Sequence, residues 1–122
     1  MQPLKKLELI LYGVSMQVFT NAALHITIAA QTIYTCAENE DVTIHNLLIT
    51  NNHATNSAII NLELHKGAGH YHPIPSNFIL KAKRTLEMKP LNLTPGDLLK
   101  ISADTDNNCD VVASILKEVR DF

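Results

Sequence analysis

The sequence predicts a single all-β domain, an antiparallel β-sandwich of jelly-roll or immunoglobulin-like type. Three observations predict this fold. The chain has 122 residues and 46% are hydrophobic, which suits one domain with its own core. Several short runs alternate between apolar and polar residues, as half-buried strands do. Clusters of turn-forming residues lie between the runs and recur at intervals of about 8 to 15 residues, a spacing typical of sandwiches and barrels.

The N-terminal third predicts strands and turns. Residues 9–37 contain no Asp, Glu, Lys or Arg, but polar residues interrupt them throughout, so we expect two or three strands and no membrane span. A turn is expected at Asn21-Ala22. Residues 1–20 form a first strand or an extended arm, ahead of a sandwich domain at residues 21–122. Glu8 interrupts the apolar run after Lys5-Lys6, which favours an unprocessed chain over a signal peptide.

The middle of the chain contains the clearest strand patterns. In Val42-Thr43-Ile44 the apolar residues follow one register, whereas Leu47 and Ile49 follow the other, so we expect a β-bulge near His45-Asn46 or a change in burial. In residues 58–65, Ile60, Leu62 and Leu64 alternate with polar residues. This run predicts a half-buried strand with one face in the core.

The last third predicts three more strands. Residues 86–89 and 99–102 alternate at a period of two, whereas residues 111–116 are apolar on both sides. The last pattern is typical of a strand at the centre of a sandwich or at a subunit contact. Pro95-Gly96-Asp97 predicts a turn, because Pro presets φ, Gly accepts a positive φ and Asp caps an amide. Further turns are expected at residues 38–41, 51–57, 67–77 and 104–108.

Charge and cysteine usage exclude several classes of partner and cofactor. The formal net charge is −2, and the longest basic run is Lys5-Lys6. Nucleic acids and anionic membranes bind clustered cations, so we expect neither partner. Cys36 and Cys109 are separated by 72 residues, and we interpret them as buried free thiols, which could still be neighbours if their strands adjoin. No cofactor is expected.

No motif for catalysis is present, so the protein is predicted not to be an enzyme. The sequence contains no nucleophile elbow, phosphate loop or H-E-x-x-H motif. Glu38, Glu40 and Asp41 share one polar turn, and Asp104 and Asp106 share another. We interpret all five as solvated turn residues rather than as paired catalytic carboxylates.

A His-rich segment is the predicted interaction loop. It contains His65, His70, Tyr71 and His72 around Gly67-Ala68-Gly69. We expect an exposed hairpin loop without a metal, although His70 and His72 could surround an ion in a trimer. Tyr71 is either an exposed platform for a partner or a side chain packed on its own loop.

Surplus apolar residues at the two ends of the domain predict an assembly surface. Its residues are Val14, Met16, Val18, Phe19, Val112 and Leu116. Strands that are apolar on both sides bury a second face only against another subunit or layer. The sequence therefore predicts a homo-oligomer that associates through sandwich faces, edge pairing and the N-terminal arm.

Three blocks of the sequence resemble a family of small bacteriophage virion-associated β-sandwich proteins. They are Ile33-Tyr34-Thr35-Cys36-Ala37, residues 42–52, and the ending formed by residues 93–103 and 110–116. The similarity covers residues 24–119, and Ala37 replaces the proline usual in the family. The resemblance implies a non-enzymatic structural protein of the tail, neck or capsid surface.

The resemblance also implies a location and a set of partners. The chain is expected in the virion after synthesis in the host cytoplasm, in contact with other capsid, neck or tail proteins. The alternative is a carbohydrate- or receptor-binding module of a phage fibre or tail tip, with a host receptor or glycan as partner. A chain without Trp is weakly equipped to stack sugars.

Overall fold

The structure is a computed structural model that describes residues 16–120, and within that range it confirms the predicted all-β sandwich. Ten strands follow one another along the chain. They are β1 (Met16–His25), β2 (Gln31–Thr35), β3 (Glu40–Asn51), β4 (Ala58–Lys66), β5 (Gly69–Tyr71), β6 (Phe78–Leu80), β7 (Thr85–Met88), β8 (Leu91–Leu93), β9 (Leu98–Ala103) and β10 (Cys109–Val119). Among the described residues, no helix is long and apolar enough to cross a membrane.

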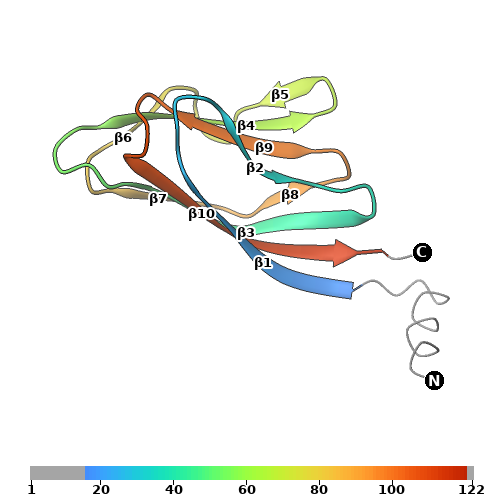
Figure 1. The fold of residues 1–122 in the computed structure, drawn as a ribbon. Coiled ribbons are helices and arrows are strands. Elements are labelled where there is room, and N and C mark those ends of the chain that lie inside the picture. The colour runs from blue at the N-terminus through green and yellow to red at the C-terminus, as the bar shows by residue number, and fades with distance from the viewer. Residues whose placement is uncertain (1–15, 121–122) are drawn as a thin grey trace.

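The strands form two antiparallel sheets that pack face to face (Figure 1). The β1 sheet has the order β1-β10-β3-β7, and β8 pairs with β3 on the same side as β7. The β2 sheet has the order β2-β9-β4-β5, and β6 also pairs with β4. Within the described range β1 is therefore an edge strand, and β10 and β3 are central.

The core lies between the sheets and follows from the alternation along each strand. On β4, Ile60, Leu62 and Leu64 are buried, while the residues between them are partly exposed, as predicted. Leu99 and Ile101 on β9 repeat the pattern. Each such side chain contributes about 1.5–3 kcal/mol when it is fully buried, so this alternation is the main source of stability.

The predicted bulge is present at His45. Asn46 pairs with Ser114, but Ile44 pairs with Ile115, so His45 is an extra residue without a partner on β10. After this extra residue, the odd-numbered residues of β3 point to the face that the even-numbered residues occupy before it. As a result Ile44 and Leu47, which would otherwise point to opposite faces, are both buried in the core.

The opposite side of β3 is interrupted at the same level. Leu47 pairs with Met88 of β7 and Ile44 pairs with Leu91 of β8, so Lys89 and Pro90 leave the ladder beside the bulge. Proline has no N–H to donate to a ladder. The edge is therefore split into two short strands, and β8 was not predicted from the sequence.

The turn expected at Asn21-Ala22 is wrong. Both residues lie within β1, where Asn21 pairs with Ser114 and Ala22 with Ala113. Asn21 is exposed on the outer face, so its polar side chain stays in water and does not break the strand. The actual connection to β2 spans residues 26–30.

The first strand is described from Met16 onward and runs past the predicted boundary at residue 20 without a break. Residues 1–15, which contain most of the predicted arm, lie outside the described range. The strands predicted at residues 86–89, 99–102 and 111–116 are confirmed, and their observed ends lie within three residues of the predicted ones.

Candidate functional site

Three of the predicted assembly residues meet on the outer face of the β1 sheet. Phe19 of β1 pairs with Leu116 of β10, and Ala23 pairs with Val112. Val112 in turn pairs with Leu48 of β3. Phe19 is 78% exposed and Val112 is 43% exposed. We call these five residues, Phe19, Ala23, Leu48, Val112 and Leu116, the outer patch.

The structure separates the other predicted assembly residues from this patch. Met16 and Val18 alternate with Phe19 along β1, so they point to the opposite face of the strand. That face turns toward the sandwich interior, but Met16 lies at the strand's end and stays half exposed. Val14 lies outside the described residues.

The edge strand β1 lacks the features that normally protect a sheet edge. Its ten residues contain no Asp, Glu, Lys, Arg or Pro, and its pairing with β10 runs without a register shift from Met16 to His25. Within residues 16–120 no strand pairs with its other side. Long, uncharged edges offer unpaired backbone groups to another chain.

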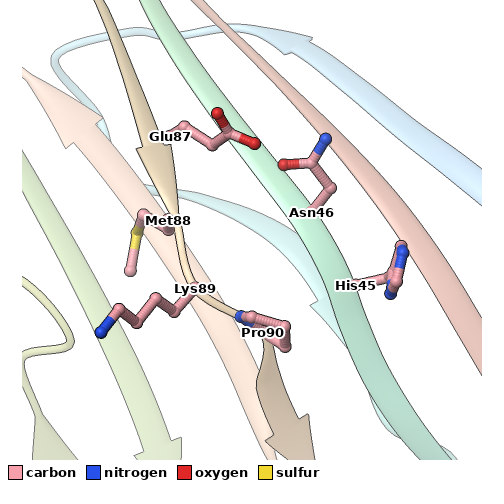
Figure 2. A pocket seen from close by; sticks show the side chains of 6 residues that line it. All are labelled: His45, Asn46, Glu87, Met88, Lys89 and Pro90. Carbon is pink, nitrogen blue, oxygen red and sulfur yellow. The ribbon is translucent and has the colours of Figure 1, made fainter.

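A shallow depression of about 440 Å³ lies where the bulge meets the break between β7 and β8. Figure 2 shows His45 and Asn46 of β3 beside Glu87, Met88, Lys89 and Pro90. A second hollow, lined by Phe19, Asn21 and Ser114, also includes His45. The outer face is thus recessed next to the outer patch. The sequence pattern predicts the bulge but not this recess. The recess also needs the break between β7 and β8 at Pro90, which the pattern does not predict.

The predicted interaction loop is partly a strand. Residues 69–71 form β5, which pairs with the end of β4 through Leu64–Tyr71, His65–His70 and Lys66–Gly69. Gly67 has φ of +59° at the first central position of the two-residue turn, which glycine adopts without strain. The predicted loop of residues 67–77 is therefore wrong for these three residues, because this turn lets the chain fold straight back into the ladder.

The four named residues of this segment face two ways. His65 and His70 stack with ring centroids 3.9 Å apart on the outer face of the β2 sheet, and His72 is exposed beyond the end of β5. Tyr71 points to the other face and covers Gly69, where an added Cβ would lie 2.9 Å from the Tyr71 ring. Tyr71 is nonetheless 55% exposed, so it packs on its own hairpin and also presents a free surface.

Glu40 is not the solvated turn residue that was predicted. It begins β3, is only 5% exposed, and accepts hydrogen bonds from the Tyr34 hydroxyl at 2.6 Å and from the Ala37 N–H at 3.1 Å. Burial acts to raise the pKa of Glu40, but these bonds and the charge of Lys117 outweigh it and lower the pKa. Burial and the bond to Glu40 raise the pKa of Tyr34.

A second buried carboxylate closes the β8–β9 turn. Asp97 forms an ion pair with Lys66 and accepts bonds from the N–H and hydroxyl of Thr94 at 2.8 and 2.9 Å. Gly96 has φ of +89°, and the Asp97 N–H donates to the Thr94 carbonyl, so the predicted Pro-Gly-Asp turn is confirmed as type II. Burial raises the pKa of Asp97, yet the bonds from Lys66 and Thr94 lower it overall.

The two cysteines are buried free thiols, as predicted. Cys36 Sγ contacts the carbonyl of Glu40 at 3.2 Å, at the start of β3. Cys109 pairs with Asn51, at the other end of β3. A strand of this length spans on the order of 35 Å, so the thiols lie at opposite ends of the sandwich and cannot pair within one chain.

Comparisons with known proteins identify the fold only. No family model matches this sequence, and no curated protein matches it. A structure of Bacillus endospore appendages, described as disulfide-linked pili, matches 89% of this chain and 91% of its own, with a TM-score of 0.53 and 8% identity. An acid-stable capsid structure of Helicobacter pylori bacteriophage KHP30 matches 88% of this chain and 90% of its own, with a TM-score of 0.53 and 12% identity.

Proposed function

We propose that this protein is a non-enzymatic structural component of a phage virion that associates with further copies of itself through the edge of β1 and the outer patch. The single observation that carries the proposal is the long, uncharged edge of β1, which pairs with no other strand of residues 16–120, beside the exposed ring of Phe19. Two structures of similar fold, a pilus and a phage capsid, are themselves assemblies, which supports a structural role.

Pairing along β1 uses the backbone groups that β10 leaves free. An added strand from a second copy would satisfy them and would bring its side chains alongside the outer patch. Antiparallel pairing of two β1 strands centred on Asn21 places Phe19 opposite Ala23 of the other copy. No like charges oppose each other in this register, because β1 carries no Asp, Glu, Lys or Arg.

The outer patch adds a hydrophobic contribution to the edge contact. Phe19 and Leu116 form one apolar pair, and Ala23 and Val112 form another, with Asn21 and Ser114 between them. Removing the Phe19 ring from water is favourable at about 25 cal/mol per Å². A polar pair at the centre of such a surface favours one register over sliding.

The cross-links of the proposed assembly are noncovalent. Cys36 and Cys109 are both buried in the core. Burial is the main reason that the pKa of Cys36 is raised to about 11, and the charge of Glu40 adds to the increase. A thiol that is neither exposed nor ionised does not form an intermolecular disulfide. In this respect the proposed assembly differs from the disulfide-linked pili of Bacillus endospores.

Sedimentation of the full chain over a range of concentrations tests the proposal. We expect concentration-dependent association that the double variant Phe19→Lys/Ala23→Lys weakens at least tenfold, because charges on an edge strand oppose pairing. Hydrogen exchange should slow at β1 amides in the associated form and not in the variant. Antibody labelling of purified phage particles should detect the chain in the virion.

Ile79→Lys is the matched control, because Ile79 is also highly exposed but lies on β6 of the other sheet. This variant should associate as the unmodified protein does. A protein that stays monomeric at high concentration and is missing from particles would contradict the proposal. Weakening by Ile79→Lys, with association retained in Phe19→Lys/Ala23→Lys, would contradict the proposal and place the contact on the β2 sheet.

A further inference from the structure

The β4–β5 hairpin gathers a carboxylate and two imidazoles on the outer face of the β2 sheet. Glu63 and His65 are two residues apart on β4 and therefore point to the same side, and His70 of β5 lies directly opposite His65. One ligand atom from each of the three lies within 4.8 Å of the others. We propose that Glu63, His65 and His70 form a binding site for Zn²⁺.

The distances suit a zinc site that closes by small side-chain rotations. The Nε2 atom of His65 and the Oε1 atom of Glu63 are 2.9 Å apart, close to the roughly 3–3.5 Å between two ligands of one tetrahedral zinc ion. The rings of His65 and His70 are inclined by 26°. Because His70 is exposed, its ring can turn so that its nitrogen points at the same ion.

The ligand types also favour zinc over hard cations. Neutral imidazole nitrogens with one carboxylate bind Zn²⁺ and its neighbours among the transition metals, whereas Mg²⁺ and Ca²⁺ prefer sets of oxygen ligands. Two histidines and one glutamate fill three tetrahedral positions and leave the fourth for water. The set differs from the His70–His72 pair that the sequence suggested, because β-pairing brings His65 closer.

Two neighbours of Glu63 affect its use as a ligand. Its Oε1 atom lies 2.9 Å from Nε2 of His65, and the two side chains would exchange this contact for bonds to the metal when zinc binds the neutral imidazole. Lys100 of β9 pairs with Glu63 on the side of β4 away from β5. Its positive charge would repel a bound cation. Its ammonium can turn into solvent, since nothing in the described range bonds to it on this face.

A bound ion would link β5 to β4 through side chains. β5 has only three residues and pairs with β4 over three positions, so its ladder alone holds it weakly. A metal shared by His65 and His70 adds a second connection across the same pair. We expect zinc to slow hydrogen exchange at the amides of Gly69–Tyr71.

Calorimetric titration of untagged full-length protein with ZnCl₂ tests the site. We expect saturable binding of one ion per chain that His65→Gln, His70→Gln and Glu63→Gln each weaken tenfold or more, and no binding of MgCl₂. In parallel, the imidazole proton resonances of His65 and His70 should shift with zinc, while those of His25 and His53 should not.

His72→Gln and His45→Gln are the matched controls, because both histidines are exposed and neither belongs to the proposed set. Each control should bind zinc within threefold of the unmodified affinity. Loss of binding in His72→Gln with binding retained in His65→Gln would overturn the proposal in favour of the other pair. Binding that survives the double variant His65→Gln/His70→Gln, or no saturable binding at all, would also overturn it.

Discussion

Tyr34 donates a 2.6 Å hydrogen bond from its hydroxyl to Oε1 of the buried Glu40, which joins the end of β2 to the start of β3 across the sandwich. The same carboxylate is near Lys117 of β10, whose Nζ atom lies 3.8 Å from Oε2. One buried charge thus connects both sheets at this end. This arrangement makes the end of the sandwich sensitive to acid.

Tyr34→Phe should destabilise the protein near neutral pH. The change removes a donor to a buried carboxylate, which costs roughly 1–3 kcal/mol in the free energy of unfolding. Because the folded-state pKa of Glu40 is lowered, the stabilisation is present above the unfolded-state pKa and is lost as pH falls through the folded value. Urea unfolding at about pH 7 and pH 3 should therefore show a smaller difference in acid. Equal stability at neutral pH would contradict this account.

Lys66→Met should also weaken the fold at neutral pH. It leaves the Asp97 carboxylate buried with only Thr94 as donor, at a cost of roughly 1–3 kcal/mol. The pKa of Asp97 should rise toward its usual value, which carbon-detected NMR of the carboxylate can measure. Lys89→Met is the control, since Lys89 is exposed and forms no ion pair with another residue of the described range, and it should leave stability within about 0.5 kcal/mol.

Gly96→Ala should lower stability because of backbone strain. The φ of +89° at this position is costly for a residue with a Cβ, by roughly 1–2 kcal/mol. The space itself is open, since the nearest atom to an added Cβ is 3.9 Å away. Gly96→Asn should cost less, because Asn tolerates positive φ better than Ala. Thermal unfolding of the two variants separates strain from crowding, which would affect Asn more.

Both cysteines should be inert in the folded protein. Burial raises the pKa of Cys36 to about 11 and also raises that of Cys109, so near pH 8 few thiolates are present. A thiol reagent should react slowly with native protein and then rapidly with two thiols once urea is added. Fast reaction of one thiol in the native state would show that one end of the sandwich opens locally.

Local patterns in the sequence were sufficient to predict most of the fold. The alternation in β4 and β9 and the register change in β3 report which face each side chain occupies, and burial follows directly from that. The turn predicted at Asn21 is wrong because turn propensity alone does not show that the residue faces water on an edge strand. The strands β6 and β8 have only three residues each, too few for an alternation to predict a strand.

The candidate sites depend on contacts that a linear pattern does not contain. Phe19 and Leu116 become neighbours only when β1 pairs with β10. Glu63 and His65 were each expected on the outer face of a strand, but their meeting with His70 depends on a two-residue turn at Gly67. The solvated position predicted for Glu40 is wrong because three acidic residues among residues 38–41 suggest a solvated turn, whereas Tyr34 and Lys117 compensate the burial of Glu40.

The pairing of Met16 with Val119 determines at which end of the sandwich the domain can be attached to another structure. The described chain enters and leaves at the same end of the sandwich, side by side (Figure 1), while the segments at residues 26–30, 52–57 and 104–108 crowd the far end. Both ends of the described chain therefore lie at one pole of the sandwich. The opposite pole is formed by these three connecting segments and contains neither end of the described chain.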